Sequence, residues 1–218
     1  MTTAGTKYSN EQTMSNPQNK ALASWEKFLN PAKMKQSLVE TSVFLAAYEM
    51  FRQSVVDHLR SFFSDVKDGK FTQSAEYKTN VIDLYPRDIF HASCLWLQQS
   101  GAIDQSDLDF IHRIRDHRNA IPHELPKFIL SVEHAADGQL LAELFKVVTK
   151  VDRWWISEVE IPTNPDFDDV EPDSIAYDKI QSGNMIIMHL ILSVFFEDES
   201  YMADIYKRFR EQAKSRSP

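Results

Sequence analysis

The chain has 218 residues, of which 43% are hydrophobic and only five are glycine, and its formal net charge is −8. This composition excludes a disordered chain and favours one compact helical domain, alone or with an extension. The negative charge argues against general binding of nucleic acid, so any contact with RNA requires a local cationic site. The single cysteine, Cys94, excludes an internal disulfide and predicts a reduced, cytoplasmic setting.

The N-terminal third is predicted to be mostly helical. Residues 1–20 are polar without an apolar run, which predicts a disordered lead rather than a signal peptide. A short helix is expected over 21–29, ended by Asn30-Pro31, and a long one over 32–66. In the long helix, apolar residues recur every three or four positions and form a core-facing stripe: Phe44, Tyr48, Phe51, Val55, Leu59, Phe62 and Val66. A short helix is expected over 76–84.

In the middle of the chain, Pro86 predicts the first turn of a helix that ends before Gly101. The next helix is expected to begin at Asp104 or Ser106, either of which is a suitable N-cap. Pro122 has no N–H for helical bonding, so we expect this helix to kink or end there, with Ile121 outside the helical region. Cys94 lies in an apolar stretch and is expected to be buried and inert.

The C-terminal third begins with a helix expected over 140–159. Its adjacent Trp154 and Trp155 point apart, which predicts a second apolar surface for an extension or a partner. Residues 162–174 read as an acidic, proline-rich connector, and 175–218 as a C-terminal extension of two helices. The apolar run 185–196 is too short to cross a bilayer, so no membrane association is expected.

The predicted fold class is therefore all-α. Residues 21–161 are expected to form an up-and-down bundle of four to five helices, followed by the two-helix C-terminal extension. Strand-like alternation is ambiguous only at 128–132.

A cationic cluster lies within residues 111–125, whose sequence is IHRIRDHRNAIPHEL. Its members are His112, Arg113, Arg115, His117, Arg118 and His123. On an ideal helix, residues five apart such as Arg118 and His123 lie about 140° apart around the axis. The break expected at Pro122 would turn His123 back toward Arg118 and open a polar pocket.

The segment Arg118-Asn119-Ala120-Ile121-Pro122-His123, followed by Glu124, resembles the R-x4-6-H motif of the HEPN superfamily in its R-N-x-x-x-H form. The expected helix–loop–helix over 88–125 is similar to the one that leads to this motif in the family. The resemblance implies a metal-independent endoribonuclease, commonly a toxin or phage-defence effector, that works as a homodimer with one composite site. Pro122 departs from the small residue that family members more often carry before the histidine.

The resemblance also implies roles for individual residues. His123 would act as the general acid–base, because imidazole titrates near neutral pH, and Arg118 would stabilise charge on the phosphate. Asn119 is the third candidate catalytic residue, and Arg115, His117 and Glu124 are candidate substrate-binding residues. The RNA supplies its own 2′-hydroxyl nucleophile, so no metal and no cofactor are expected.

Two other interpretations stay open. In the first, the protein is a non-catalytic, dimeric binding or scaffold module, and Arg118, Asn119 and His123 form a buried polar network paired with Glu49 or Glu124. In the second, a helical protein carries the pattern by chance. A protein antitoxin or regulator is a further possible partner. It would act by binding, since Leu125 stands where some related toxins carry a modifiable tyrosine.

Overall fold

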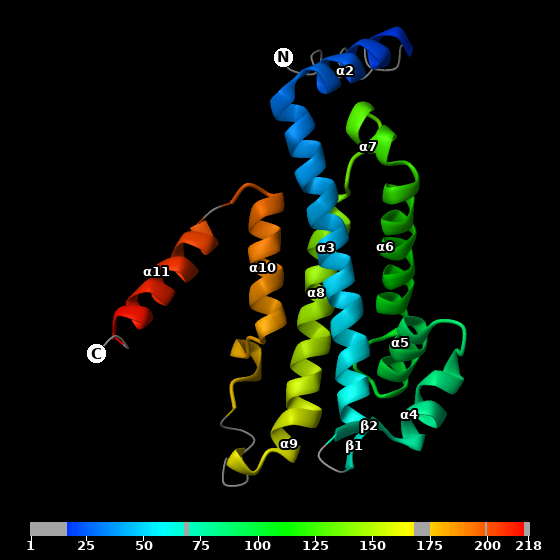
Figure 1. Cartoon of the computed structure of the whole chain (residues 1–218), viewed down its shortest axis with the longest axis vertical. Coiled ribbons are helices and arrows are strands. Elements are labelled where there is room, and N and C mark those ends of the chain that lie inside the picture. Colours follow the sequence, from blue (N-terminus) through cyan, green and yellow to red (C-terminus); the bar gives the residue numbers. More distant parts are fainter. Residues whose placement is uncertain (1–16, 68–69, 168–174, 199, 216–218) are drawn as a thin grey trace, which may run out of the picture.

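The structure is a computed structural model that describes residues 17–67, 70–167, 175–198 and 200–215. Over these residues the fold is the all-α bundle that the sequence predicted, with one small hairpin that it did not predict. Helix α3 (Pro31–Phe62) runs along the length of the molecule (Figure 1). The helices that pack against it include α5 (Ile89–Gln99), α6 (Gln105–His123), α8 (Gly138–Trp155) and α10 (Gly183–Phe195).

Helices α2 and α3 meet at Asn30. Helix α2 (Pro17–Leu29) ends there, and the Asn30 side chain accepts hydrogen bonds from the N–H groups of Ala32 and Lys33 at the start of α3. Helix α2 begins at Pro17, so residues 17–20 are helical rather than part of a disordered lead. The rest of the predicted lead, residues 1–16, lies outside the described residues.

Helix α3 is shorter than predicted because a hairpin follows it. Strand β1 (Ser64–Lys67) pairs antiparallel with β2 (Lys70–Gln73), with Ser64 opposite Gln73 and Lys67 opposite Lys70. Val66 is therefore a strand residue, and its β-branched side chain suits that conformation better than a helix. Phe62, the last residue of α3, is 47% exposed and does not join the core.

Caps define where the middle helices begin and end. Asp88 accepts hydrogen bonds from the N–H groups of Phe90 and His91, so α5 starts at Ile89 and Pro86 lies outside it. Gly101 follows α5 with φ of +80°, the left-handed conformation that glycine adopts without strain. Asp104 and Asp107 form a capping box at the start of α6.

Shorter elements complete the chain. Before α5 lie α4 (Ala75–Asn80) and the 3-10 turn η1 (Ile82–Leu84), as expected. The ambiguous stretch after α6 is helix α7 (Leu125–Leu130). After α8 come the π-helix η2 (Ile156–Glu160), α9 (Ile161–Thr163) and the 3-10 turns η3 (Pro165–Phe167) and η5 (Tyr177–Lys179). Of the predicted acidic connector, residues 168–174 lie outside the described residues.

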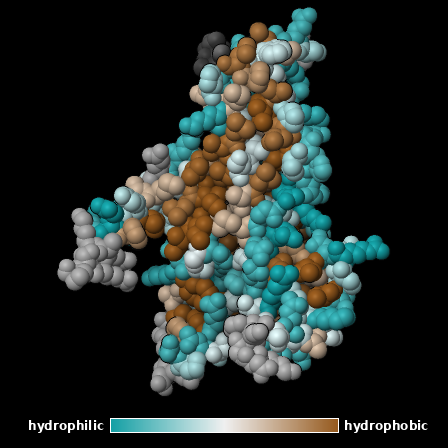
Figure 2. Space-filling model, in the orientation of Figure 1, coloured by the Kyte–Doolittle hydropathy of each residue, from teal (hydrophilic) through white to brown (hydrophobic). Residues whose placement is uncertain are grey.

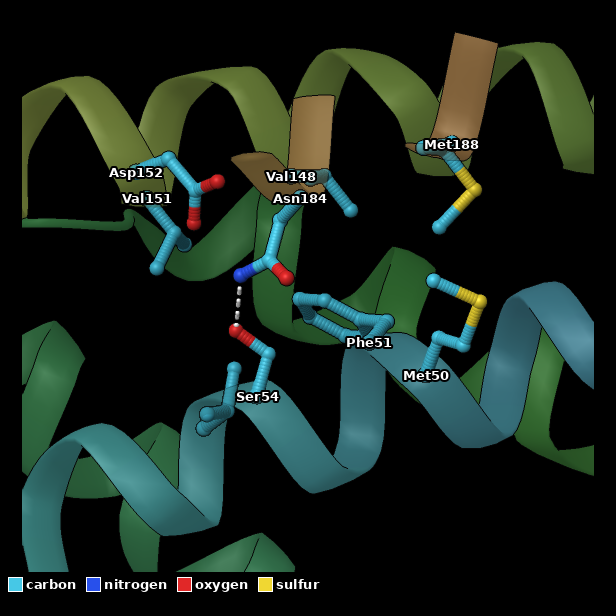
Figure 3. A pocket seen from close by; sticks show the side chains of 9 residues that line it. Met50, Phe51, Ser54, Val148, Val151, Asp152, Asn184 and Met188 are labelled. Carbon is cyan, nitrogen blue, oxygen red and sulfur yellow. Dashed lines mark hydrogen bonds between the residues drawn. The ribbon is translucent and has the colours of Figure 1, made fainter. Parts of the chain in front are cut away.

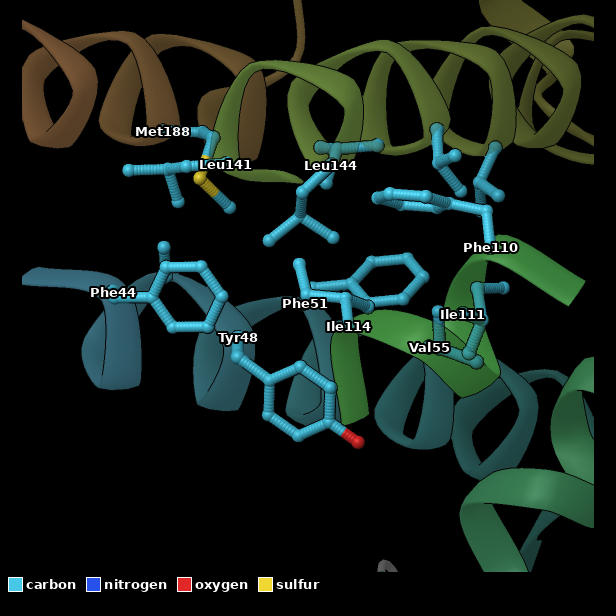
Figure 4. Close-up of a cluster of buried hydrophobic side chains, with 14 of the residues drawn as sticks. Phe44, Tyr48, Phe51, Val55, Phe110, Ile111, Ile114, Leu141, Leu144 and Met188 are labelled. Atoms are coloured by element: carbon cyan, nitrogen blue, oxygen red, sulfur yellow. The ribbon is translucent and has the colours of Figure 1, made fainter. Parts of the chain in front are cut away.

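The core lies between α3, α6, α8 and α10 (Figure 4). Buried side chains from these helices include Phe44, Phe51, Ile114, Leu144 and Met188. The stripe predicted on α3 is buried from Phe44 to Leu59. Cys94 is fully buried, as predicted, and burial raises the pKa of its thiol.

Helix α10 belongs to the bundle and not to an extension. Its buried residues are in the same core as those of α3 and α8: Met185, Met188, Leu192 and Phe195. Polar contacts at its start fix its position. Asn184 Nδ2 donates to Ser54 Oγ on α3 at 2.6 Å (Figure 3). Ser182 Oγ donates to the buried Asp152 carboxylate on α8. Of the two predicted C-terminal helices, only α11 (Ser200–Ser215) projects from the bundle (Figure 1).

The two adjacent tryptophans pack within the chain. Trp155 is buried, with its ring stacked on His58 of α3 at 4.9 Å, and Trp154 meets Trp96 of α5 edge-on at 6.2 Å. The second apolar surface expected there is therefore covered by α3 and α5. Hydrophobic residues instead gather on the face shown in Figure 2, and the exposed apolar side chains of α3 and α10 include Leu38, Ile187 and Val194.

None of the described helices combines the length and the apolar character needed to cross a membrane.

Candidate active-site cleft

Helix α6 carries most of the predicted site residues, and its buried face determines where they point. Ile111, Ile114 and Ile121 are buried against the bundle at spacings of three and seven residues, which fixes the rotation of the helix. Arg115 and Arg118 follow one another at a spacing of three on the flank of that face. Both side chains are half-buried where α6 lies near α3 and the start of α5.

Pro122 does not break α6 in the way the sequence suggested. Ile121 is helical and fully buried, and the Glu124 N–H donates to the Ala120 carbonyl at 2.9 Å, so the helix ends only after His123. Pro122 removes a single hydrogen bond in the last turn, and burial of Ile121 holds the backbone helical. His123 is exposed, and neither a hydrogen bond nor an ion pair joins it to Arg118.

The arginines of α6 open onto a polar cleft of about 440 Å³ between α3, α6 and the start of α5. It is lined by Tyr48, Glu49, Arg52, Asp88, Phe90, Arg115, Arg118 and Asn119. Three arginines face two carboxylates, so the cleft is cationic although the whole chain is acidic.

Arg118 is held on three sides. Its Nη2 donates to Glu49 Oε1 on α3, its Nη1 donates to Asn119 Oδ1 at 3.1 Å, and its guanidinium lies 5.8 Å from the centre of the Tyr48 ring. The Arg118 Nε–H is buried and meets no acceptor among the residues that the structure describes. Burial raises the pKa of Tyr48 to about 12, so this ring stays neutral beneath the cation.

Arg115 connects α6 to the start of α5. Its Nη1 lies 2.9 Å from Asp88 Oδ2, and the same carboxylate caps α5. Across the cleft, Arg52 Nη1 lies 3.6 Å from Glu49 Oε2. Each carboxylate of the cleft therefore orients at least one arginine, and each guanidinium retains further N–H groups for an anionic ligand.

A second hollow of about 420 Å³ shares Asp88 and Arg115 with the cleft. Its other lining residues are Tyr85, Arg87, His91 and His112. His112 Nε2 and His91 Nδ1 lie 3.2 Å apart, within hydrogen-bonding distance. No local pattern predicts this pair, because its members are 21 residues apart and meet only through the packing of α5 on α6.

The other predicted site residues, His117, His123 and Glu124, do not line the cleft of their own chain. His117 is directed into the protein: its Nε2 accepts the Asp137 N–H at 3.2 Å, and its ring contacts Phe44 and Phe128. Glu124 pairs with Lys127 at 2.9 Å and lies 3.8 Å from His134. The structure thus brings together Arg115, Arg118 and Asn119, and places His117, His123 and Glu124 elsewhere.

Comparisons with protein-family models, with curated proteins and with solved structures find no significant match. The assignment of residues 118–123 to the HEPN motif therefore stays a prediction.

Proposed function

We propose that the protein is a metal-independent endoribonuclease of the HEPN type that acts as a homodimer. The observation that carries this proposal is the cationic cleft, in which Arg118 and Asn119 of the R-N-x-x-x-H stretch lie beside two further arginines. A local site of this kind reconciles binding of a polyanion with a net charge of −8.

The chemistry requires only charge stabilisation and proton transfer. When the 2′-hydroxyl attacks the neighbouring phosphorus, negative charge grows on the non-bridging oxygens, and a guanidinium such as Arg118 can donate two hydrogen bonds to them. Nη1 and Nη2 of Arg118 each donate to one printed acceptor, Asn119 and Glu49, and the second N–H of each supports this role as a donor to a bound oxyanion. His123, exposed at the end of α6, has the acid–base chemistry that the leaving oxygen needs.

The separation of Arg118 from His123 supports a site shared by two chains. Both residues lie on one helix, where a spacing of five puts them about 140° apart around the axis. In a two-fold dimer formed about α6, His123 of one chain would instead approach Arg118 of its partner. A dimer in which each chain supplies one of the two groups is thus the simplest way to unite them on one phosphate.

The experiment is incubation of purified protein with total RNA in the presence of a chelator, beside His123→Ala. We expect wild-type cleavage that leaves 2′,3′-cyclic phosphate ends, and a loss of about 10²–10⁴-fold in the variant. Unchanged cleavage by His123→Ala, with its melting temperature preserved, would exclude His123 as the acid–base. If the wild-type protein cleaves no RNA, the proposal that it is a ribonuclease is rejected.

One observation favours a second candidate, a non-catalytic dimeric binding module. Arg118 is already bound to Glu49 and Asn119, which is the polar network that such a module would use to hold α6 on α3. The network is partly exposed, with 33% of the Arg118 side chain and 41% of the Glu49 side chain accessible to solvent. A module of this kind would dimerise and fold normally while leaving every RNA intact.

A role as a toxin or phage-defence effector, and control by a protein antitoxin, extend the proposal to a biological setting. An inhibitor that binds over the cleft would block it directly, because Arg115, Arg118 and Asn119 all line an open surface hollow.

A further inference from the structure

The hollow lined by His91 and His112 has a chemistry of its own, which the HEPN-type motif does not use. Arg87 and Arg115 supply two fixed positive charges beside one carboxylate, Asp88. The two imidazoles then add a variable charge in the same hollow. A site with this combination favours an anion, and it favours the anion more strongly when the imidazoles are protonated.

We propose that this hollow binds a phosphodiester of the RNA backbone and takes up a proton as it does so. The choice of RNA as the ligand rests on the proposed function, whereas binding of a phosphodiester as such does not. The hollow continues from the Arg118 cleft through Arg115 and Asp88, so one strand of RNA can occupy both with neighbouring phosphates.

The hydrogen bond between the rings explains the coupling to a proton. The contact uses His112 Nε2 and His91 Nδ1, which leaves His91 Nε2 and His112 Nδ1 as the outer nitrogens. In the neutral pair, one proton lies between the rings, and the outer nitrogens comprise one donor and one acceptor. A third proton on the pair turns that acceptor into a donor and adds a full positive charge. Both changes favour an oxyanion.

The surroundings of His91 disfavour its protonated form. Partial burial, followed by the proximity of His112, lowers the pKa of His91, while the Asp88 carboxylate acts in the opposite direction and Arg115 adds to the lowering. The Tyr85 ring packs edge-on against His91 with centroids 4.7 Å apart. Tyr85, Arg87, Asp88 and Arg115 are the titratable groups that share the hollow with the two histidines. A bound phosphodiester offsets the repulsion from Arg115 and from the second ring, so the pair gains a proton on binding.

The test uses a dinucleoside monophosphate made only of 2′-deoxy residues, which has no nucleophile for cleavage and carries one negative charge across the whole pH range. Its dissociation constant is measured by calorimetry between pH 5.5 and 8.5 on the full chain. Uptake of one proton predicts affinity that weakens by up to about tenfold per pH unit through the titration of the pair. Wild-type affinity that is the same at every pH would overturn the proposal.

Three variants locate the effect. His112→Gln keeps a polar group beside His91 but cannot hold the extra charge, so its binding should be weak and independent of pH. Arg115→Gln should weaken binding at every pH while retaining the pH dependence. His134→Gln, which changes a histidine outside the hollow, should bind like the wild type. Wild-type binding by His112→Gln would also overturn the proposal.

The outcomes separate this inference from the ribonuclease. If the protein leaves RNA intact but binds the deoxy probe with this pH dependence, the proposed phosphodiester site is supported and the proposed ribonuclease is rejected. If the protein cleaves RNA through His123 but binds the probe without any contribution from His112, the proposed ribonuclease is supported and the proposed phosphodiester site is rejected.

Discussion

Arg118 on α6 donates a hydrogen bond to Glu49 on α3, a residue 69 positions away in the chain. This pair joins the predicted catalytic motif to the longest helix of the bundle and fixes the guanidinium at the edge of the cleft. The two proposed functions, ribonuclease and binding module, assign this contact different roles. An enzyme uses the pair to orient an arginine, and a scaffold uses it to hold two helices together.

Arg118→Lys tests which role dominates. Lysine keeps the charge but cannot form two parallel hydrogen bonds to a phosphate, so RNA cleavage should fall by about 10²–10³-fold. Because both side chains are partly exposed, weakening of the ion pair with Glu49 should lower the free energy of unfolding by no more than about 1 kcal/mol. Cleavage rates and melting curves on the same preparation measure both. A large fall in melting temperature without any activity to lose would support the scaffold.

His117 should make the fold sensitive to mild acid. Burial lowers its pKa from the ordinary value of 6.5, so the unfolded chain binds this proton more readily than the folded one. Stability contributed by the neutral ring is therefore present above pH 6.5 and declines as the pH falls below that value. His117→Gln keeps an acceptor for the Asp137 N–H, so its melting temperature should decrease by a few degrees less than that of the wild type between pH 7.5 and 5. An identical decrease in both proteins would contradict this account of His117.

Truncations test the placement of α10 in the bundle. A chain that stops after Asp198 lacks α11 and should melt within a few degrees of the full protein. A chain that stops after Gln181 also loses Met185, Met188, Leu192 and Phe195 from the core. Each such side chain stabilises the fold by about 1.5–3 kcal/mol, and four of them approach the net stability of a typical domain. We therefore expect the shorter chain to be unfolded by circular dichroism. A cooperative melt for it would show that α10 is an extension after all.

Asp152 is a buried carboxyl whose pKa is raised by burial, against the effect of its Ser182 hydrogen bond. A raised pKa means that its contribution to stability is fully present below the unfolded value of 3.8 and is lost as the pH rises through the folded pKa. Asp152→Asn keeps an acceptor for Ser182 without the charge and should match or exceed wild-type stability at pH 7. Asp152→Ala leaves Ser182 without its partner and should lose about 1–3 kcal/mol. Equal losses in the two variants, measured by chemical denaturation, would show that the charge itself is needed.

Local patterns predicted the fold class well. The apolar stripe of α3, the helix end at Asn30, the cap at Asp104 and the glycine after α5 all depend on a few neighbouring residues, so the sequence predicts them. The sequence does not predict the hairpin, because the apolar stripe of α3 continues in register to Val66.

Long-range packing limits how many of the site residues can be predicted from the sequence. Arg118 and Asn119 were found because they form part of a contiguous motif. The sequence indicates Glu49 only as a partner of Arg118 in the binding module and carries no signal for His91, since α3 and α5 bring these two residues to α6 from distant parts of the chain. The effect of Pro122 was overestimated, because burial of Ile121 depends on tertiary contacts that the local sequence does not reveal.

The most direct test of the central claim is complementation between two inactive variants. Arg118→Ala and His123→Ala are co-expressed with different tags, and heterodimers carrying both tags are purified. If the composite site pairs Arg118 of one chain with His123 of its partner, such a heterodimer retains one of its two Arg118–His123 pairs and should cleave RNA at about half the wild-type rate. If the heterodimers are as inactive as either parent variant, Arg118 and His123 act from the same chain. If the chains do not associate at all, no site is shared between them.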